Sequence, residues 1–256
     1  MNNAVSATHS LPLVVAVTGH RDLVDVEVEG IRSAIQQLFE CLIRDYPDRE
    51  LQLLTPLAEG ADQLAAEVAL ELGCSVIALL PMSVAAYRND FKGDERMAAF
   101  ERLLNQCDEV IELEPVRVGR VAENGGSSNR DMHYAQLGVF MAAHCHVLLA
   151  VWDGKPSQHM GGTSNVVQFH HDQVMPGYTE AVFATREMLI DDESDLVYHV
   201  VCSRDRPNGE PAEGLNPLEC WWFSKDAEQP RSKTLPDQHR AIFSRSNEFS
   251  RDCNRY

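Results

Sequence analysis

The sequence predicts an α/β fold of three layers, in which helices cover both faces of a mostly parallel central sheet. Apolar runs of strand length alternate along the chain with segments whose apolar residues recur at helical spacing, and this alternation is typical of a parallel sheet between helices. The length of 256 residues and the hydrophobic content of 44% are those of one globular domain with a sizeable core.

The first half of the chain contains three predicted strands and two predicted helices. The strands are the apolar runs 11–18, 51–57 and 74–81. Apolar residues at helical spacing indicate a helix over 26–45, and Pro47 follows just beyond its end. A second helix over 61–73 ends at Gly73, a residue type that favours the C-cap position.

The second half continues the alternation after a more polar beginning. Its predicted elements are a turn and a helix within 83–107, a strand over 108–113, a helix over 130–144, a strand over 146–152, a helix over 161–171 and a strand over 195–202, which we expect to be the last. The segment 114–129 is rich in turn residues typical of a mobile loop, and we expect it to act as a lid.

The sequence changes character after Ser203. We expect residues 1–203 to form the ligand-binding domain and residues 204–256 to form a polar C-terminal extension or linker, because this part is turn-rich and lacks core periodicity. Its aromatic cluster, Trp221 to Phe223, is expected either to anchor the extension on the domain or to mark an oligomer contact.

Charge and composition limit the classes of partner. The formal net charge is −17, whereas affinity for nucleic-acid polymers comes largely from basic residues that release counterions, so we expect no such polymer as a partner. A small anion remains compatible, since a helix N-terminus and one arginine act locally. Without a secretory signal or an apolar run of membrane-spanning length, we expect a cytoplasmic chain with no membrane segment. The seven cysteines contain no C-x-x-C pair and are expected to be reduced thiols.

Polar turns follow three predicted strands at their carboxyl ends, where open α/β sheets bind ligands. The first turn contains Gly19, His20 and Arg21. Gly19 allows the backbone to approach a ligand closely, and the guanidinium of Arg21 matches a phosphate or a carboxylate. The alternative is a tight turn in which Arg21 pairs with Asp22 on the surface.

The second turn, Glu59, Gly60, Ala61 and Asp62, lies where a strand leads into a helix. The amides of the new helix would point at a bound anion, and Glu59 would accept hydrogen bonds from ribose hydroxyls. Asp62 either contacts the ligand or caps the helix.

The third turn begins with Trp152, Asp153 and Gly154 at a strand end and continues to a helix start. The helix start consists of Gly161, Gly162, Thr163 and Ser164. Two glycines followed by two hydroxyl residues supply backbone and side-chain donors, which makes this segment either a phosphate cradle or a flexible loop with a Thr or Ser cap.

The order and strand placement of these motifs, TGHRD, PLAEGADQLAAEVALELG and WDG with GGTSNVV, resemble the SLOG superfamily of Rossmann-like domains. This superfamily includes the LOG phosphoribohydrolases, also called lysine decarboxylase-like proteins, and the DprA-like proteins. The resemblance covers about residues 11–203. It implies a Rossmann-like nucleotide-binding domain and, as for many bacterial members, a sensor in a conflict or anti-phage signalling system.

The sequence departs from the LOG enzymes at two positions. Their third motif resembles PGGxGTxxE, and alignment of Gly162 and Thr163 with its GT pair places Val166 where the catalytic glutamate stands. An ungapped register places Leu137 at the position of the catalytic arginine. Cleavage of a ribosyl bond needs a carboxylate to stabilise its cationic transition state, so a LOG-type enzyme is not favoured, and Asp153, Glu59 or Asp22 would have to substitute.

We therefore predict a sensor that binds a nucleotide or a nucleotide-derived small molecule, including NAD-derived ligands, needs no cofactor and forms a homo-oligomer. The alternatives are a phosphoribohydrolase or NAD-type N-glycosidase with a shifted carboxylate, and an assembly module without a ligand. No metal site is expected, because the histidines lack ligand spacing. Two further groups, Tyr87–Asp90 and Arg130–Tyr134, either contact the ligand or are ordinary loop and helix-start residues.

Overall fold

The computed structural model describes residues 11–114, 129–157, 159–179, 195–225 and 231–253. Its strands are β1 (Leu13–Gly19), β2 (Leu51–Thr55), β3 (Ser75–Leu80), β4 (Glu109–Glu112), β5 (Val147–Trp152), β6 (Val197–Val201), β7 (Cys220–Phe223) and β8 (Arg231–Ser232). Its helices are α1 (Asp25–Asp45), α2 (Ala61–Glu71), α3 (Val84–Tyr87), the 3-10 turn η1 (Arg88–Asp90), α4 (Asp94–Leu104), α5 (Asn129–Ala143), α6 (Thr163–Asp172) and α8 (Asp237–Cys253). The strands and helices predicted up to residue 202 are present, with ends shifted by a few residues.

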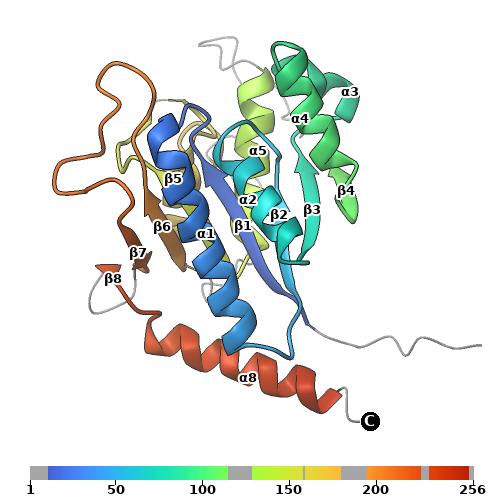
Figure 1. The fold of residues 1–256 in the computed structure, drawn as a ribbon, viewed down its shortest axis with the longest axis vertical. Coiled ribbons are helices and arrows are strands. Elements are labelled where there is room, and N and C mark those ends of the chain that lie inside the picture. Colours follow the sequence, from blue (N-terminus) through green and yellow to red (C-terminus); the bar gives the residue numbers. More distant parts are fainter. Residues whose placement is uncertain (1–10, 115–128, 158, 180–194, 226–230, 254–256) are drawn as a thin grey trace, which may run out of the picture.

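The strands form one sheet in the order β4-β3-β2-β1-β5-β6-β7-β8 (Figure 1). The strands from β4 to β6 are parallel to their neighbours. From β1 the chain builds outward through β2, β3 and β4 and then crosses back, so that β5 pairs with the free side of β1 and Val15 lies opposite Val147. The connections diverge between β1 and β5, and this switch point is where open α/β sheets bind their ligands.

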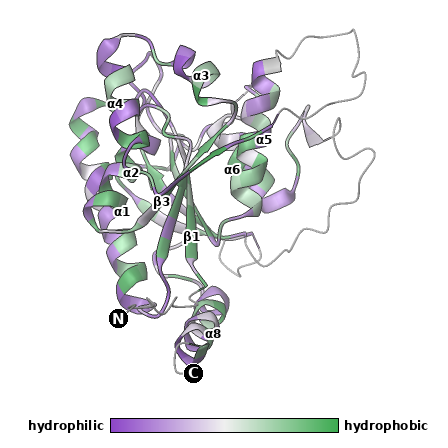
Figure 2. Cartoon of the chain, turned by 90° about the vertical axis from the view of Figure 1, so that its right-hand side faces the viewer, coloured by the Kyte–Doolittle hydropathy of each residue, from purple (hydrophilic) through white to green (hydrophobic). Residues whose placement is uncertain are grey.

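Helices cover both faces of the sheet, which confirms the predicted three layers (Figure 2). On one face, Val15 and Val17 of β1 pack in a core with α1 and α2. On the other face, Ala16 packs with residues of α5 and α6. Since alternate residues of β1 enter two different cores, both faces of this strand are buried, and this explains its uninterrupted apolar sequence.

The prediction that 195–202 is the last strand is wrong. β7 pairs antiparallel with β6, with Trp222 opposite Tyr198, and the two rings meet edge to face with 4.8 Å between their centroids. β8 then pairs antiparallel with β7. These strands of four and two residues lie in a polar, turn-rich sequence and are too short to produce an alternating pattern. The aromatic cluster expected to be a docking anchor is therefore part of the sheet.

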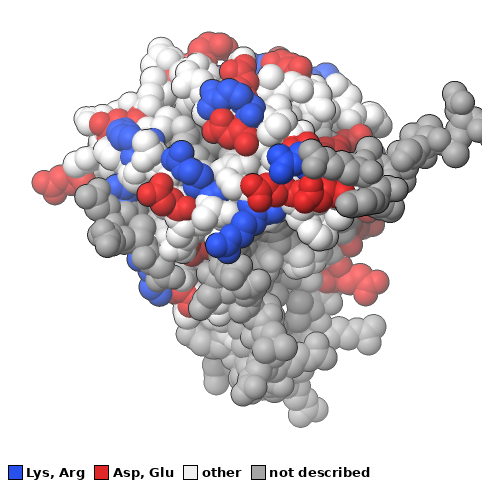
Figure 3. Space-filling model, turned by 90° about the horizontal axis from the view of Figure 1, so that it is seen from below, with Lys and Arg blue, Asp and Glu red and all other residues white. Residues whose placement is uncertain are grey.

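Helix α8 lies across the amino end of the sheet, opposite to the loops that follow the parallel strands (Figure 1). Phe243 packs edge-on against Tyr46 at 5.5 Å between ring centroids, and Nε2 of the buried His239 lies 3.2 Å from Oδ1 of Asp195. Figure 3, seen from this end, shows acidic and basic side chains interspersed. Among the helices in the described segments, none has both the length and the apolar character that a membrane crossing requires.

Candidate ligand-binding site

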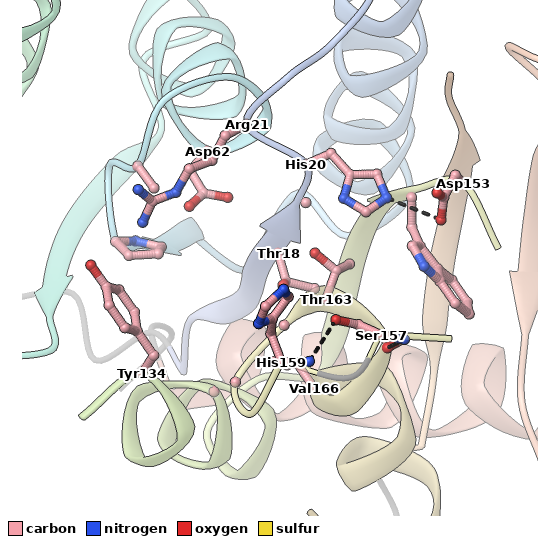
Figure 4. A pocket seen from close by; sticks show the side chains of 18 of the residues that line it. Thr18, His20, Arg21, Asp62, Tyr134, Asp153, Ser157, His159, Thr163 and Val166 are labelled. Atoms are coloured by element: carbon pink, nitrogen blue, oxygen red, sulfur yellow. Dashed lines mark hydrogen bonds and ion pairs between the residues drawn. The ribbon is translucent and has the colours of Figure 1, made fainter. Parts of the chain in front are cut away.

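A cavity of about 610 Å³ opens at the carboxyl ends of β1 and β5, at the switch point of the sheet (Figure 4). This volume lies within the range of roughly 300–1,000 Å³ that is typical of small-molecule sites. Loops after β1, β2, β5 and β6 contribute to its wall, together with α3, α5 and α6. The lining residues that the sequence predicted as ligand contacts are Gly19, His20, Arg21, Asp62, Trp152, Asp153, Gly161, Gly162, Thr163 and Ser164.

The first loop leaves β1 at Gly19, where there is no room for a side chain. A Cβ atom at this position would lie 2.4 Å from Cβ of Ala61 and 2.9 Å from the carbonyl oxygen of Val151. The amide of His20 donates to Val151 at 3.1 Å, and the amide of Ala61 donates to the carbonyl of His20 at 3.1 Å. Glycine thus allows the end of β5 and the start of α2 to pack directly against the first loop.

His20 and Asp153 form a buried pair at one end of the cavity (Figure 4). Nε2 of His20 lies 3.1 Å from Oδ1 of Asp153. Burial alone would raise the pKa of Asp153, but the contact with His20 and a 3.0 Å hydrogen bond from the amide of Lys155 outweigh it and hold that pKa below its usual value. Asp153 is therefore an ionised acceptor at neutral pH.

Arg21 reaches the opposite end of the cavity (Figure 4). Its Cζ atom lies 5.7 Å from the centre of the Tyr134 ring, and Tyr134 is fixed in turn by its hydroxyl, which donates to Asp90. The predicted alternative, a pair with Asp22, is not formed, since Asp22 pairs with Arg204 at 2.8 Å. Arg21 forms no ion pair with any residue that the structure describes, so the donors that its hydrogen bond with Tyr134 leaves unused are available to an anion.

Three residues of the second loop that were predicted as ligand contacts do not line this cavity. Glu59 turns outward, and its Oε2 accepts a hydrogen bond of 2.9 Å from Arg96 on α4. Gly60, with φ of +77°, packs beneath the first loop, where an added Cβ would lie 2.6 Å from the carbonyl oxygen of Arg21. Ala61 is buried against Gly19. Gly60 and Ala61 therefore position Arg21 from below.

Asp62 is the residue of this turn that faces the cavity. The N-cap of α2 is Gly60, so Asp62 is not the cap. The residue is only 5% exposed, and its Oδ1 atom has no hydrogen-bond partner among the described residues. Burial raises the pKa of Asp62 to about 8, although Arg21 and the backbone of Ala58 both oppose the shift. The cavity therefore contains one ionised carboxylate, Asp153, and one carboxyl that holds its proton to higher pH.

The third loop places the N-terminus of α6 in the cavity wall. Gly162 is the N-cap, and its carbonyl accepts the amides of Asn165 and Val166. Within the described segments, no acceptor is bonded to the amides of Thr163 and Ser164. These two N–H groups and the positive end of the helix dipole suit a phosphate.

Gly161 and Gly154 have different roles in the same loop. Gly161, with φ of +75°, lies so close to α5 that an added Cβ would be 2.7 Å from the carbonyl carbon of Tyr134. Gly154, which was also predicted as a ligand contact, does not line this cavity, and Leu215 packs over it and would lie 2.5 Å from an added Cβ. Gly161 thus brings α6 against α5, and Gly154 lets the segment after β6 cross β5.

Several lining residues were missed by the sequence analysis. Arg204 and Arg206 come from the segment after β6, which was assigned to the extension, and Lys155 and Ser157 come from the middle of the third loop. The sequence contained a signal for the two arginines, because the RDR segment follows the parallel strand β6. Ligands of open α/β sheets bind at the carboxyl ends of parallel strands, and β6 is one of them. Ser157 became apparent only in the fold, where its amide donates to Oγ of Ser164 at 2.8 Å.

Both positions that depart from the LOG pattern lie in the cavity wall. Leu137 and Val166 are buried there, and Val166 packs onto Gly138, whose added Cβ would be 2.6 Å from a methyl carbon of Val166. The wall is apolar at this point. Residues 115–128 of the predicted lid lie outside the described residues. In the segments that are described, no three metal-ligating side chains gather into a metal site.

Neither a family model nor a curated protein matches the chain. The solved structures that are similar to it include two of DNA processing protein A. One is DNA processing protein A (DprA) from Streptococcus pneumoniae, with 18% identity and a TM-score of 0.38 over 61% of this chain and 45% of that chain. The other is DprA from Helicobacter pylori, with 18% identity and a TM-score of 0.38 over 62% of each chain, described for its single-stranded DNA binding mode. The chain thus spans less than two thirds of either protein, and the likeness concerns the fold alone.

The prediction that no nucleic-acid polymer is a partner is contradicted by this comparison, because one of the similar proteins is described as binding single-stranded DNA. The prediction used the net charge of −17, which is a sum over the whole chain. The cavity nevertheless gathers Arg21, Lys155, Arg204 and Arg206 at one edge of the sheet. Phosphate recognition depends on such local groups, so the net charge excludes neither small nor polymeric phosphate ligands.

Proposed function

We propose that this protein binds a nucleotide or a nucleotide-derived small molecule in the cavity between β1 and β5 and acts as a sensor of that ligand. One observation supports this proposal above all. Arg21, which has no ionic partner among the described residues, lines the same cavity as the unbonded amides of Thr163 and Ser164. Guanidinium groups and helix N-termini are well suited to donate hydrogen bonds to phosphate oxygens.

The other lining residues suit the remainder of a nucleotide. Asp153 is an ionised acceptor for sugar hydroxyls, a role in which it replaces the outward-facing Glu59. Tyr134 and Trp152 supply aromatic surface on two sides. The volume of about 610 Å³ accommodates more than an isolated phosphate.

The way the cavity is joined to the end of the sheet supports the sensor role. Arg204 contacts Asp22 through its side chain, and its backbone forms a bridge with Leu23. A ligand that moves the first loop would therefore also move the segment that leads to β7. The resemblance to SLOG domains supports a signalling role of this kind, in a conflict or anti-phage system and as a homo-oligomer.

Isothermal titration with ADP-ribose, NAD and AMP tests the proposal. We expect at least one of them to bind in a one-to-one ratio, and we expect Arg21→Ala to weaken that binding by about 10- to 100-fold, the effect of a lost charge-assisted hydrogen bond. Arg102→Ala is the matched control, since Arg102 is exposed, pairs with Glu67 on α2 and lies outside the cavity. Equal losses in both variants, or no binding of any of the three compounds, would contradict the proposal.

A second candidate function is hydrolysis of an N-ribosyl bond, and one observation favours it. Asp62 and Asp153 line one cavity and have pKa values shifted in opposite directions, which is how paired carboxyl groups divide the acid and charge-stabilising roles in glycosidic cleavage. The apolar Leu137 and Val166 argue against it. Release of free base from nucleoside monophosphates or NAD, abolished by Asp153→Asn, would establish this activity.

A further inference from the structure

Asp62 has an oxygen atom that no group in the described part of the protein satisfies. The residue is 95% buried, and Oδ1 has no partner in the described part of the chain. A buried polar atom without a partner costs free energy, so such atoms commonly mark a place where a ligand completes the hydrogen bonding. Figure 4 shows the carboxyl group beside Arg21 at the edge of the cavity. The proposed phosphate and sugar contacts leave this atom unexplained.

The charged and titratable groups around Asp62 come from three elements. Arg21 of the first loop lowers the pKa of Asp62, and Tyr87 of α3 interacts electrostatically with Asp62. Tyr134 of α5 lies against Arg21. Burial raises the pKa of both tyrosines, so they stay neutral, and arginine keeps its charge. In this corner Asp62 is the group that changes charge near neutral pH, because burial raises its pKa to about 8.

We propose that Asp62 contacts the ligand as a neutral carboxylic acid and donates a hydrogen bond to the anionic group that Arg21 binds, so that affinity depends on the proton on this one side chain. The inference rests on the proposed function and adds a named contact and its regulation to it. A protonated carboxyl has one O–H donor, whereas a carboxylate only accepts hydrogen bonds and repels a phosphate. The ligand class is therefore one with a phosphate or pyrophosphate group at this end of the cavity.

The sign of the pH dependence follows from this contact. Below its pKa, Asp62 carries the proton that it donates to the ligand. Above that pKa, each further pH unit lowers the fraction of protein molecules with a protonated Asp62 about tenfold. Affinity should therefore stay nearly constant up to about pH 7.5 and fall about tenfold between pH 7 and pH 9.

ADP-ribose is the appropriate probe, because its pyrophosphate has no proton that titrates in this interval. We would measure its dissociation constant by isothermal titration at pH 7, 8 and 9 for the wild type, Asp62→Asn and Glu59→Gln, with circular dichroism at each pH to verify folding. Asparagine keeps the shape of the carboxyl and a donor but does not titrate. Glu59→Gln is the matched control, since Glu59 belongs to the same turn but faces Arg96 outside the cavity.

The inference is supported if affinity falls about tenfold from pH 7 to pH 9 in the wild type and in Glu59→Gln but stays constant in Asp62→Asn. A wild-type affinity that does not change with pH overturns it, and so does an equal fall in Asp62→Asn. In both of these cases ADP-ribose still binds, so the proposed function stands. Absence of ADP-ribose binding at every pH, with no binding of NAD or AMP, overturns the proposed function and this inference together.

Discussion

Replacement of Asp62 by asparagine should stabilise the protein, and the gain should increase with pH. The carboxyl is buried, its Oδ1 has no partner among the described residues, and burial raises its pKa from 3.8 to about 8. A group whose pKa is raised by folding contributes stability that is fully present below the unfolded-state pKa and is lost as pH rises to the folded-state value. Asparagine is nearly isosteric and does not titrate, so the difference between the two proteins isolates this effect.

The size of this stability difference follows from the interval between the ordinary pKa of Asp62, 3.8, and its folded-state pKa of about 8. At about 1.4 kcal/mol for each pH unit, the free energy of unfolding of Asp62→Asn should rise relative to the wild type by up to about 6 kcal/mol between pH 4 and pH 8. This value is an upper bound, because water that enters the open cavity lowers the cost of ionising Asp62. Above about pH 8 the difference should remain constant.

Urea unfolding at pH 5, 7 and 9, followed by circular dichroism, measures this difference. Asp153→Asn is the matched comparison, since its pKa is lowered in the fold. The ionised Asp153 stabilises the fold at neutral pH, and this contribution is lost as pH falls through the folded-state pKa. Asp153→Asn should therefore have a lower free energy of unfolding than the wild type at pH 7, and the difference should shrink in acid. A difference for Asp62→Asn that changes by less than about 1 kcal/mol from pH 5 to pH 9 would refute the reasoning about Asp62.

Three other substitutions test the packing and the site. Gly19→Ala should lower the free energy of unfolding by about 1–3 kcal/mol, because the new Cβ would overlap Ala61, and an unchanged urea midpoint would contradict this. Trp222→Ala should cost about 3–5 kcal/mol, because the ring is buried in the sheet extension against Tyr198, whereas a cost typical of a surface residue would show that β7 is not part of the core. Arg204→Ala should weaken ADP-ribose binding by about tenfold in a titration at low salt, and unchanged affinity would place the ligand away from β6.

The sequence was sufficient to predict the parallel part of the fold for a physical reason. Strands such as β1 are buried on both faces, so their apolar runs are continuous and unambiguous. The part after residue 203 lacked this signal. β7 and β8 are short and antiparallel, and α8 has only a narrow apolar face around Phe243 in an otherwise polar sequence. Elements of this kind are fixed by tertiary pairing rather than by a local pattern.

For the candidate site, the sequence predicted which loops come together but not which of their side chains face the cavity. The rule that ligands bind at the carboxyl ends of parallel strands selected the loops of Gly19, Asp62 and Thr163, and these lie around one cavity. Direction within a turn depends on neighbours that are distant in sequence. Arg96 of α4 draws Glu59 outward, and Leu215 covers Gly154. Neither contact has a signal in the turn itself.

Hydrogen–deuterium exchange with saturating ADP-ribose tests most directly whether these separate loops bind one ligand. We predict slower exchange in peptides that cover 18–22 and 161–165 together, with no change over α8, residues 237–253, at the opposite end of the sheet. Protection confined to α8 or to another surface, with both loops unaffected, would contradict the account.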